Sequence, residues 1–328
     1  MRAIGYRRQG LAREVLEALD LPPPVPAPGE ASVRLMASGV NPADCNRRAG
    51  RGHAMDAALI VPHSDGAGVV EAVGQEADRH WIGQRVWLYN AQRGRAMGTA
   101  AEQVCLDVSL LSELPPHVAF EHGACLGIPC MTAWCALFGN GELAGQTVLV
   151  TGGAGAVGHY AIQLAVDAGA RVLSTASTPD KAREALEAGA VAVADYRSPD
   201  CARQLLDAAG GAPITRIVDV DFGRNLSTTL ALAAENATVV AYASRGDEHP
   251  HLPFYDLLRR NLRLQTLYLA GLPLPLRQAA QAGIGRWLHR AAVQHRVAAS
   301  FPLAQTVQAH EAVERGDKRG TVVVLPQS

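Results

Sequence analysis

The chain has 328 residues, of which 48% are hydrophobic and 19% charged, and its formal net charge is -1. This length suits two domains, and the hydrophobic fraction excludes a disordered chain. The near-zero net charge argues against a nucleic-acid-binding protein that relies on counterion release. Because no run of about 18 apolar residues occurs, we also expect no membrane span.

The N-terminal sequence and the cysteines indicate a reducing compartment. The first ten residues, MRAIGYRRQG, lack the apolar core of a signal peptide, so we expect a cytoplasmic protein. The six cysteines form no CxxC pair and no Cys/His cluster with metal-ligand spacing. Cys125, Cys130 and Cys135 would point in different directions from a helix. We therefore expect small buried hydrophobic side chains rather than disulfides or metal ligands.

The first 118 residues predict a β-rich domain. Short strand-like runs, separated by turn segments, occur at 33–36, 68–73, 85–88 and 102–105. Asn41, Pro42, Asp44 and Gly50 are spaced as the N-cap, first position, third position and end of a short helix. A longer helical stretch is expected from about 119 to 138, with a break at Pro129.

A different pattern begins at residue 147 and indicates a second domain. Apolar strand-like runs at 147–151, 171–175, 191–195, 214–220, 238–243 and 264–269 alternate with helix-like segments. This alternation predicts a doubly wound α/β domain with a parallel sheet covered on both faces. The tail predicts helices at 276–295 and 304–315 and a strand at 321–325. We expect the apolar edge strand 264–269 to pair two copies in a homodimer.

A glycine-rich turn is the most informative motif. The run TVLVT at 147–151 leads into a G-x-G-x-x-G pattern, and a helix follows to about residue 168. Such a strand, turn and helix bind the pyrophosphate of a dinucleotide through backbone N–H groups and the helix dipole. The alternative is that the glycines serve packing alone. The expected contacts are Gly153, Gly155, Ala156, Val157 and Gly158.

The end of the second strand favours NADPH over NADH. An NAD site usually places an acidic residue there to bind the ribose 2′-hydroxyl, but residues 174–178 contain no carboxylate. Hydroxyl groups of Ser174 and Ser177 and the charge of Lys181 can instead bind a 2′-phosphate. The alternative is that Lys181 and Arg183 pair with glutamates on a solvated helix face.

The motifs together resemble the quinone oxidoreductases (zeta-crystallin-like), a zinc-independent branch of the medium-chain dehydrogenase/reductase superfamily. The segments that carry the resemblance are SGVNPADCNRRAG (38–50), PHSDGAGVVEAVG (62–74), CLGIPCMTAWCAL (125–137), VLVTGGAGAVGHYAIQLA (148–165) and GTVVVLP (320–326). It implies a Rossmann domain (119–270) inserted into a GroES-like β-rich domain built from 1–118 and 271–328. It also implies NADPH-dependent reduction of quinones or enones, usually by a dimer.

The resemblance also implies site residues. It places Asn41 beside the nicotinamide, where its amide could bind a developing oxyanion; alternatively, Asn41 is only a helix cap. Asp44 is a second candidate catalytic residue or only the third residue of that helix. His53, near a tyrosine position of some members, is a candidate proton donor or a surface-loop histidine. The further cofactor contacts that it implies are Thr132, Lys181, Tyr196, Ala243, Ser244, Tyr268 and Leu269.

Zinc-dependent members of the superfamily carry three ligands at positions that here hold Asn41, Ser64 and Ile128. We therefore expect no catalytic metal. Without a Lewis acid, an already activated acceptor such as a quinone is the favoured substrate. The sequence predicts an NADPH-dependent oxidoreductase that transfers hydride to a quinone. The alternatives are an enal/enone double-bond reductase of the same fold and a non-catalytic nucleotide-binding protein.

Overall fold

The computed structural model describes residues 1–52 and 54–328. These residues divide into two compact units: unit 1 comprises Met1–Ile128 and Ile284–Ser328, and unit 2 comprises Pro129–Gly283. The sequence places the two junctions after residues 118 and 270. In the structure the first junction falls later because helix α3 (Phe120–Gly123) packs against strands of unit 1, and the second falls within helix α10 (Leu274–Arg290).

Unit 1 is built on one large sheet with the strand order β14-β15-β3-β4-β5-β7, and β6 pairs with β3. The strands expected in this part of the chain are all present, whereas β7 and the edge strand β14 were not predicted. The bounds are β3 Glu30–Val40, β4 Asp65–Val73, β5 Arg85–Leu88, β6 Gln103–Asp107, β7 Leu111–Glu113, β14 Val297–Pro302 and β15 Thr321–Leu325.

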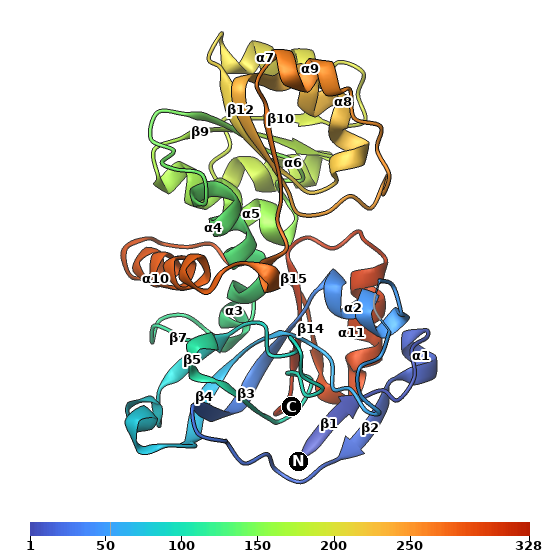
Figure 1. Cartoon of the computed structure of the whole chain (residues 1–328), viewed down its shortest axis with the longest axis vertical. Coiled ribbons are helices and arrows are strands. Elements are labelled where there is room, and N and C mark those ends of the chain that lie inside the picture. The colour runs from blue at the N-terminus through green and yellow to red at the C-terminus, as the bar shows by residue number, and fades with distance from the viewer. Residues whose placement is uncertain (53) are drawn as a thin grey trace. The chain divides into compact units, whose positions relative to one another are not determined.

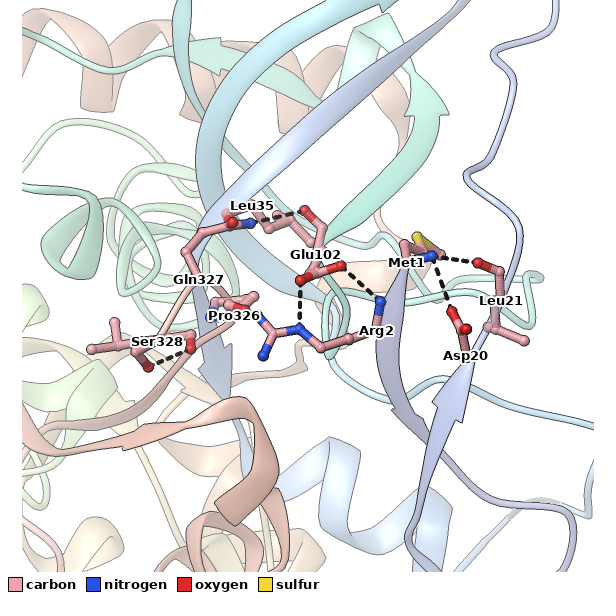
Figure 2. A network of polar contacts seen from close by, with 10 residues as sticks. Met1, Arg2, Asp20, Leu21, Leu35, Glu102, Pro326, Gln327 and Ser328 are labelled. Atoms are coloured by element: carbon pink, nitrogen blue, oxygen red, sulfur yellow. Dashed lines mark hydrogen bonds and ion pairs between the residues drawn. The ribbon is translucent and has the colours of Figure 1, made fainter.

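Strand β3 joins the two ends of the chain. It pairs antiparallel with β4, β6 and β15, and Gly39 of β3 lies opposite Val323 of β15. Figure 1 shows the red β15 beside the blue β3. Side-chain contacts add to this pairing: Arg2 Nε donates to Glu102 at 2.6 Å, and Gln327 Nε2 donates to the carbonyl of Leu35 at 3.0 Å (Figure 2). Unit 1 is therefore completed by segments from both ends of the sequence.

Short elements surround this sheet. A two-stranded sheet pairs β1 (Arg2–Gly5) with β2 (Glu17–Asp20). Helix α2 (Pro42–Ala49) begins after Asn41 and ends at Gly50, which adopts the left-handed conformation with a φ of +79°. This confirms the predicted helix. The other helical segments are α1 Ala12–Val15, η1 Glu76–Trp81, η2 Val108–Leu110, η3 Leu126–Cys130, η5 Leu303–Gln305 and α11 Thr306–Glu314.

Unit 2 contains a six-stranded parallel sheet with the order β10-β9-β8-β11-β12-β13. Helices alternate with the strands along the chain, which confirms the predicted doubly wound α/β fold (Figure 1). The strand bounds are β8 Thr147–Val150, β9 Arg171–Ala176, β10 Ala192–Asp195, β11 Ile214–Asp219, β12 Ala233–Ala241 and β13 Arg263–Thr266. The helices are α4 Met131–Phe138, α5 Ala156–Asp167, α6 Pro179–Glu187, α7 Cys201–Ala209, α8 Phe222–Leu232, α9 Phe254–Arg259, η4 Leu269–Gly271 and α10.

The strand order fixes where a ligand can approach unit 2. Numbered along the chain, the strands lie in the order 3-2-1-4-5-6, which reverses direction between β8 and β11. Every residue of β8 is buried, as expected for a strand covered on both faces. In such sheets, ligands bind outside the carboxyl ends of the strands at the point where the order reverses.

Candidate functional site

The glycine turn lies at this reversal point, directly after β8. The motif predicts that its first glycine, Gly153, makes the tight turn. In the structure Gly152 makes it instead, since its φ of +67° lies in the left-handed region. The turn is anchored to β9, since Gly152 N donates to Thr175 Oγ1 at 3.0 Å and Gly153 N donates to the Thr175 carbonyl at 3.1 Å. Helix α5 then begins at Ala156 with Gly155 as its N-cap.

The three motif glycines have different reasons to lack a side chain. A Cβ on Gly153 would lie 2.2 Å from Ser174 Oγ, and one on Gly158 would lie 2.3 Å from the Gly152 carbonyl oxygen. These two glycines therefore permit close packing. A Cβ on Gly155 would meet only the Gly152 oxygen, at 3.2 Å, so this position is not required by tight packing. Packing alone thus accounts for two of the glycines but not for Gly155.

The start of α5 fits a dinucleotide phosphate. Gly155, Ala156 and Val157 are partly exposed, whereas Gly158 is buried. The N-cap residue offers no side chain to the first N–H groups of the helix. Such groups at a helix N-terminus bind anions through hydrogen bonds and the helix dipole. Gly155 N already donates to the Gly152 carbonyl at 2.9 Å, so the N–H groups that could bind an anion are those of the first residues of α5, Ala156 and Val157.

A buried carboxylate that the sequence did not reveal supports the other side of the turn. Asp219, at the end of β11, is fully buried and accepts hydrogen bonds from Thr151 Oγ1 at 3.1 Å, Asn225 Nδ2 at 2.7 Å and Thr229 Oγ1 at 2.9 Å. Thr151 Oγ1 in turn accepts from Val220 N at 2.9 Å. This network ties the ends of β8 and β11 to helix α8. The signal in the sequence is an acidic residue directly after the apolar pair Ile217 and Val218 at the end of a strand.

The residues expected to bind a 2′-phosphate do not all remain available for it. Ser174 is fully buried and its hydroxyl donates to the Val150 carbonyl at 2.7 Å, so this candidate packs the turn instead. Ser177 and Lys181 are partly exposed, and Tyr196 is 37% exposed. Lys181 N donates to the N-cap residue Thr178 at 3.3 Å, which positions Lys181 in the first turn of α6.

The remaining cofactor candidates occupy separate places in unit 2. Thr132 is buried on α4, a helix that packs against α5. Ser244 Oγ accepts from Gly223 N at 2.9 Å, and the Ala243 carbonyl accepts from Phe222 N at 2.9 Å, so both residues hold the start of α8. Tyr268 is 68% exposed and Leu269 is buried, beyond the end of β13.

Unit 1 brings Asn41 between two buried carboxyl groups. The backbone N–H of Asn41 donates to Asp44 Oδ2 at 2.8 Å, as expected for the third residue of α2. The side-chain Nδ2 of Asn41 donates to Asp65 Oδ2 at 2.7 Å. Asp65 Oδ2 also accepts from Ile128 N at 2.7 Å. Asn41 is therefore the N-cap residue and is also held by its side chain.

Burial raises the pKa of both carboxyl groups. Desolvation raises the pKa of Asp44 to about 7, although its hydrogen bonds and Arg47 oppose the shift. Desolvation, together with the nearby charge of Asp44, raises the pKa of Asp65 well above its ordinary value. Asp65 Oδ1 has no hydrogen-bond partner among the described residues, and a Cβ on Gly127 would lie 2.2 Å from it. Asp65, like Asp219, was not among the residues expected from the sequence.

A buried hydrogen-bond chain adjoins Asp65 in unit 1. Thr99 Oγ1 donates to the Asp65 carbonyl at 2.6 Å, so Ser38 Oγ must donate to Thr99 at 2.7 Å. Ser38 then accepts from His63 Nδ1 at 2.9 Å. His63 Nε2 must therefore accept from His310 Nε2, 2.9 Å away. Hydrogen counting thus assigns the proton to Nδ1 in His63 and to Nε2 in His310.

Three further sequence predictions concern His53, the cysteines and membrane spans. His53 lies outside the described residues. All six cysteines are buried and free, as predicted, and desolvation raises the pKa of the Cys125 thiol to about 12. In the described part of the chain, no helix is long and apolar enough to cross a membrane.

Comparison with known proteins identifies the family. Residues 27–177 match the alcohol dehydrogenase GroES-like domain family, and residues 156–282 match the family described as zinc-binding dehydrogenase. The chain is 30% identical over 313 residues to the quinone oxidoreductase of Pongo abelii, covering 93% of this chain and 92% of that protein. The chain belongs to the quinone oxidoreductase family of medium-chain dehydrogenases/reductases. This confirms the resemblance seen in the sequence.

Solved structures of similar fold include an enzyme in complex with NADPH and an NAD-dependent enzyme. The quinone oxidoreductase of Thermus thermophilus was solved alone and with NADPH. It is 30% identical to this chain and has a TM-score of 0.81, and the match covers 99% of this chain and 100% of that one. An NAD-dependent alcohol dehydrogenase is 27% identical, with a TM-score of 0.90 and the same coverage. The fold is therefore shared by enzymes of both cofactor types.

Zinc-dependent relatives carry metal ligands at three positions. In this chain, two of these positions direct hydrogen-bond donors at a carboxyl oxygen instead. Asn41 Nδ2 and Ile128 N, at two of these positions, both direct N–H groups at Asp65 Oδ2. N–H groups are hydrogen-bond donors and cannot ligate a cation. Over residues 1–52 and 54–328, no group of three or more His, Cys, Asp or Glu side chains is arranged to hold a metal ion.

Proposed function

We propose that this chain is an NADPH-dependent oxidoreductase that transfers hydride to a quinone without the assistance of a metal ion. The observation that carries the proposal is the glycine turn of unit 2. Its partly exposed residues 155–157 form the N-cap and the first two positions of α5, at the point where the strand order reverses. This is the place where doubly wound sheets bind dinucleotides.

NADPH is supported by relatives and by residues near the turn. The Thermus thermophilus quinone oxidoreductase was solved with NADPH. In this chain, Gly155, Ala156 and Val157 would hold the pyrophosphate, and Ser177, Lys181 and Tyr196 would face the 2′-phosphate. We retain Thr132, Ala243, Ser244, Tyr268 and Leu269 as candidate contacts, whereas Ser174 is assigned to packing because its hydroxyl donates to Val150.

Quinone reduction needs hydride and a hydrogen bond to the oxygen that becomes negative. Bound NADPH would supply the hydride. An amide NH2 group has two hydrogens, and one hydrogen of Asn41 is committed to Asp65. The second hydrogen would bind the substrate oxygen. Asp44 and Asp65 would act as positioning residues, because they hold the backbone and side-chain nitrogens of Asn41.

A conjugated acceptor suits this donor set better than an isolated carbonyl. Carbonyl–alcohol interconversion in zinc-dependent relatives uses the metal as a Lewis acid, and the corresponding positions here are Asn41, Ser64 and Ile128. Quinones need no such activation. Enals and enones are also conjugated and need no such activation, so an enal/enone double-bond reductase is the second candidate.

The test is an acceptor screen on the purified protein. NADPH and NADH oxidation is followed with 1,4-benzoquinone, an alkenal and a saturated aldehyde, with and without a chelator, and the metal content is measured in parallel. We expect NADPH-dependent turnover of the quinone that the chelator does not reduce. Preference for the alkenal would support the double-bond reductase. NADPH binding with no turnover over a broad panel would support a non-catalytic protein, and chelator-sensitive turnover with stoichiometric zinc would refute metal independence.

We also propose that the protein forms a homodimer through the edge of the unit 2 sheet. β13 is one of the two edge strands of this sheet, and Leu264 on it is 38% exposed. Phe254, Tyr255 and Leu258 on α9, and Tyr268 beyond the strand, are 59–68% exposed. Pairing with a second copy would cover the open backbone groups of β13 and these exposed apolar side chains. A monomer in sedimentation experiments at micromolar concentration would refute the dimer.

The cytoplasmic location stays a prediction.

A further inference from the structure

An ion pair lies beside the end of β9, a strand end whose own residues carry no charge. Asp195 ends β10 and is in register with Ala176 of β9. The Arg197 guanidinium contacts this carboxylate twice, with Nε 3.0 Å from Oδ1 and Nη2 2.8 Å from Oδ2. Nη2 also donates to the Ser177 carbonyl. The pair is therefore attached directly to the end of β9.

This position is close to the glycine turn along the same strand. The turn is hydrogen-bonded to Thr175, and Ser177 lies only two residues farther on. In doubly wound folds the end of this second strand recognises the 2′ position of the adenosine ribose. An acidic residue there binds the 2′-hydroxyl of NAD, and an arginine nearby accommodates the 2′-phosphate of NADP. Here Asp195, which ends the neighbouring strand β10, and Arg197, which follows it, bring a carboxylate and a guanidinium beside this strand end.

The pair is accessible to a ligand and has unused hydrogen-bonding capacity. The side chains of Arg197 and Asp195 are 59% and 44% exposed. A guanidinium carries five N–H donors on three nitrogens. Nε and Nη2 are engaged as described above, and Nη1 makes no hydrogen bond within the described part of the chain. Arg197 can therefore keep its contact with Asp195 while Nη1 binds an anion.

We infer that the Asp195–Arg197 pair determines the choice between NADPH and NADH. Arg197 masks the Asp195 carboxylate and presents Nη1 to the 2′-phosphate of NADPH. Without Arg197, the exposed carboxylate repels a 2′-phosphate and accepts a hydrogen bond from the 2′-hydroxyl of NADH. The inference rests on the proposed function. It names two residues of opposite charge that would set the cofactor preference.

Four variants test the pair: R197A, D195N, the double variant D195N/R197A, and R203A as a matched control. Arg203 forms an exposed ion pair of the same kind with Asp200 at 3.0 Å, on helix α7. The dissociation constants of NADPH and NADH are measured by fluorescence titration. Competition with 2′,5′-ADP and with 5′-AMP isolates the 2′-phosphate from the nicotinamide. Thermal unfolding shows that each variant is folded.

The inference predicts effects of opposite sign for the two cofactors. R197A should raise the Kd for NADPH and for 2′,5′-ADP about 10-fold or more, while the Kd for NADH and 5′-AMP stays equal or falls. D195N/R197A should recover part of the NADPH affinity, because the repelling charge is gone. D195N alone should bind NADPH as tightly as the wild type or more tightly, and R203A should match the wild type.

The outcomes separate the inference from the proposed function. Equal changes of both Kd values in R197A would identify the pair as a structural clamp on Ser177 and overturn the inference, although NADPH binding would still stand. The absence of additional loss in R197A relative to D195N/R197A would overturn the masking role of Arg197. A wild-type protein that binds neither nicotinamide cofactor would refute the proposed function and the inference together.

Discussion

The side-chain nitrogen of Asn41 lies 2.7 Å from Oδ2 of Asp65, and both residues are buried in unit 1. The same oxygen accepts the backbone N–H of Ile128, also at 2.7 Å. One carboxyl oxygen thereby joins the start of helix α2 to the segment η3. Because Asn41 is the proposed donor to the substrate oxygen, this contact links the stability of unit 1 to the proposed chemistry.

The Asp65 contact can be tested with two substitutions. Asp65→Ala leaves Asn41 Nδ2 and Ile128 N without an acceptor, and we expect it to lower the free energy of unfolding by about 2–4 kcal/mol. Burial raises the pKa of Asp65 and favours the neutral acid, so the isosteric Asp65→Asn should lower it by less than about 1 kcal/mol. Urea denaturation measures both values. Equal losses in the two variants would contradict the assigned role of this oxygen.

Asp44 should make stability depend on pH. Its pKa is raised to about 7 in the folded protein, so its contribution is fully present below the unfolded pKa of about 4 and is lost as the pH rises through 7. Asp44→Asn removes this titration. The unfolding free energy of the variant, relative to the wild type, should therefore rise between pH 4 and 7 by at most about 1.4 kcal/mol per pH unit. Parallel pH profiles in urea denaturation would rule this out.

The buried histidine pair should have fixed tautomers. Hydrogen counting places the proton on Nδ1 of His63 and on Nε2 of His310. Desolvation lowers the pKa of His63 to about 3 and that of His310 well below its ordinary value, so both rings should stay neutral at pH 7. Long-range 15N–1H NMR correlation distinguishes the tautomers. The opposite tautomers, or a charged ring, would contradict the direction assigned to these hydrogen bonds.

The same pair should reduce stability in acid. A neutral histidine with a lowered folded pKa contributes stability above the unfolded pKa of about 6.5, and this contribution is lost as the pH falls toward 3. Replacing both histidines with glutamine should flatten the profile over this range, since glutamine does not titrate. The measurement is urea denaturation of wild type and double variant at matched pH values, and identical slopes would be the contrary result.

Two glycines of the turn should respond differently to substitution. Gly155→Val should keep the fold, because a Cβ there approaches only the Gly152 oxygen, but it should weaken NADPH binding about 10-fold or more by blocking the pyrophosphate. Gly158→Ala brings a Cβ to 2.3 Å from that oxygen and should cost about 1–3 kcal/mol of stability. Calorimetric titration and thermal unfolding separate the effects. If Gly155→Val bound NADPH normally, the turn would not be the phosphate site.

The sequence predicted the parts of the structure that depend on local patterns. The apolar run at 147–150 and the glycine motif identified the parallel sheet and the start of α5, because strand and helix periodicity are visible within a few residues. The spacing of Asn41, Pro42 and Asp44 likewise located α2. The family resemblance rested on these same segments.

The sequence could not predict contacts between distant segments. Asp65 lies 24 positions from Asn41, and Asp219 lies 68 positions from Thr151, so neither partnership is visible in the spacing. Ser174 looked like a phosphate ligand because its position on β9 is right, but its side chain faces the sheet and donates to Val150. The sequence does not indicate that Asp195 and Arg197 lie at the end of β9, because they belong to the neighbouring strand and its loop.

The pairing of β3 with β15 has a consequence for biosynthesis. A nascent chain leaves the ribosome from its N-terminus at about 5–20 residues per second, and domains generally fold as units. The strands of the unit 2 sheet all come from one continuous stretch, so this sheet can assemble as soon as that stretch has emerged. Gly39 of β3, by contrast, can pair with Val323 of β15 only after nearly the whole chain has been synthesised. Until translation is nearly finished, β3 lacks its β15 neighbour and exposes backbone groups to which other chains can bind, so molecular chaperones should be needed most during this interval.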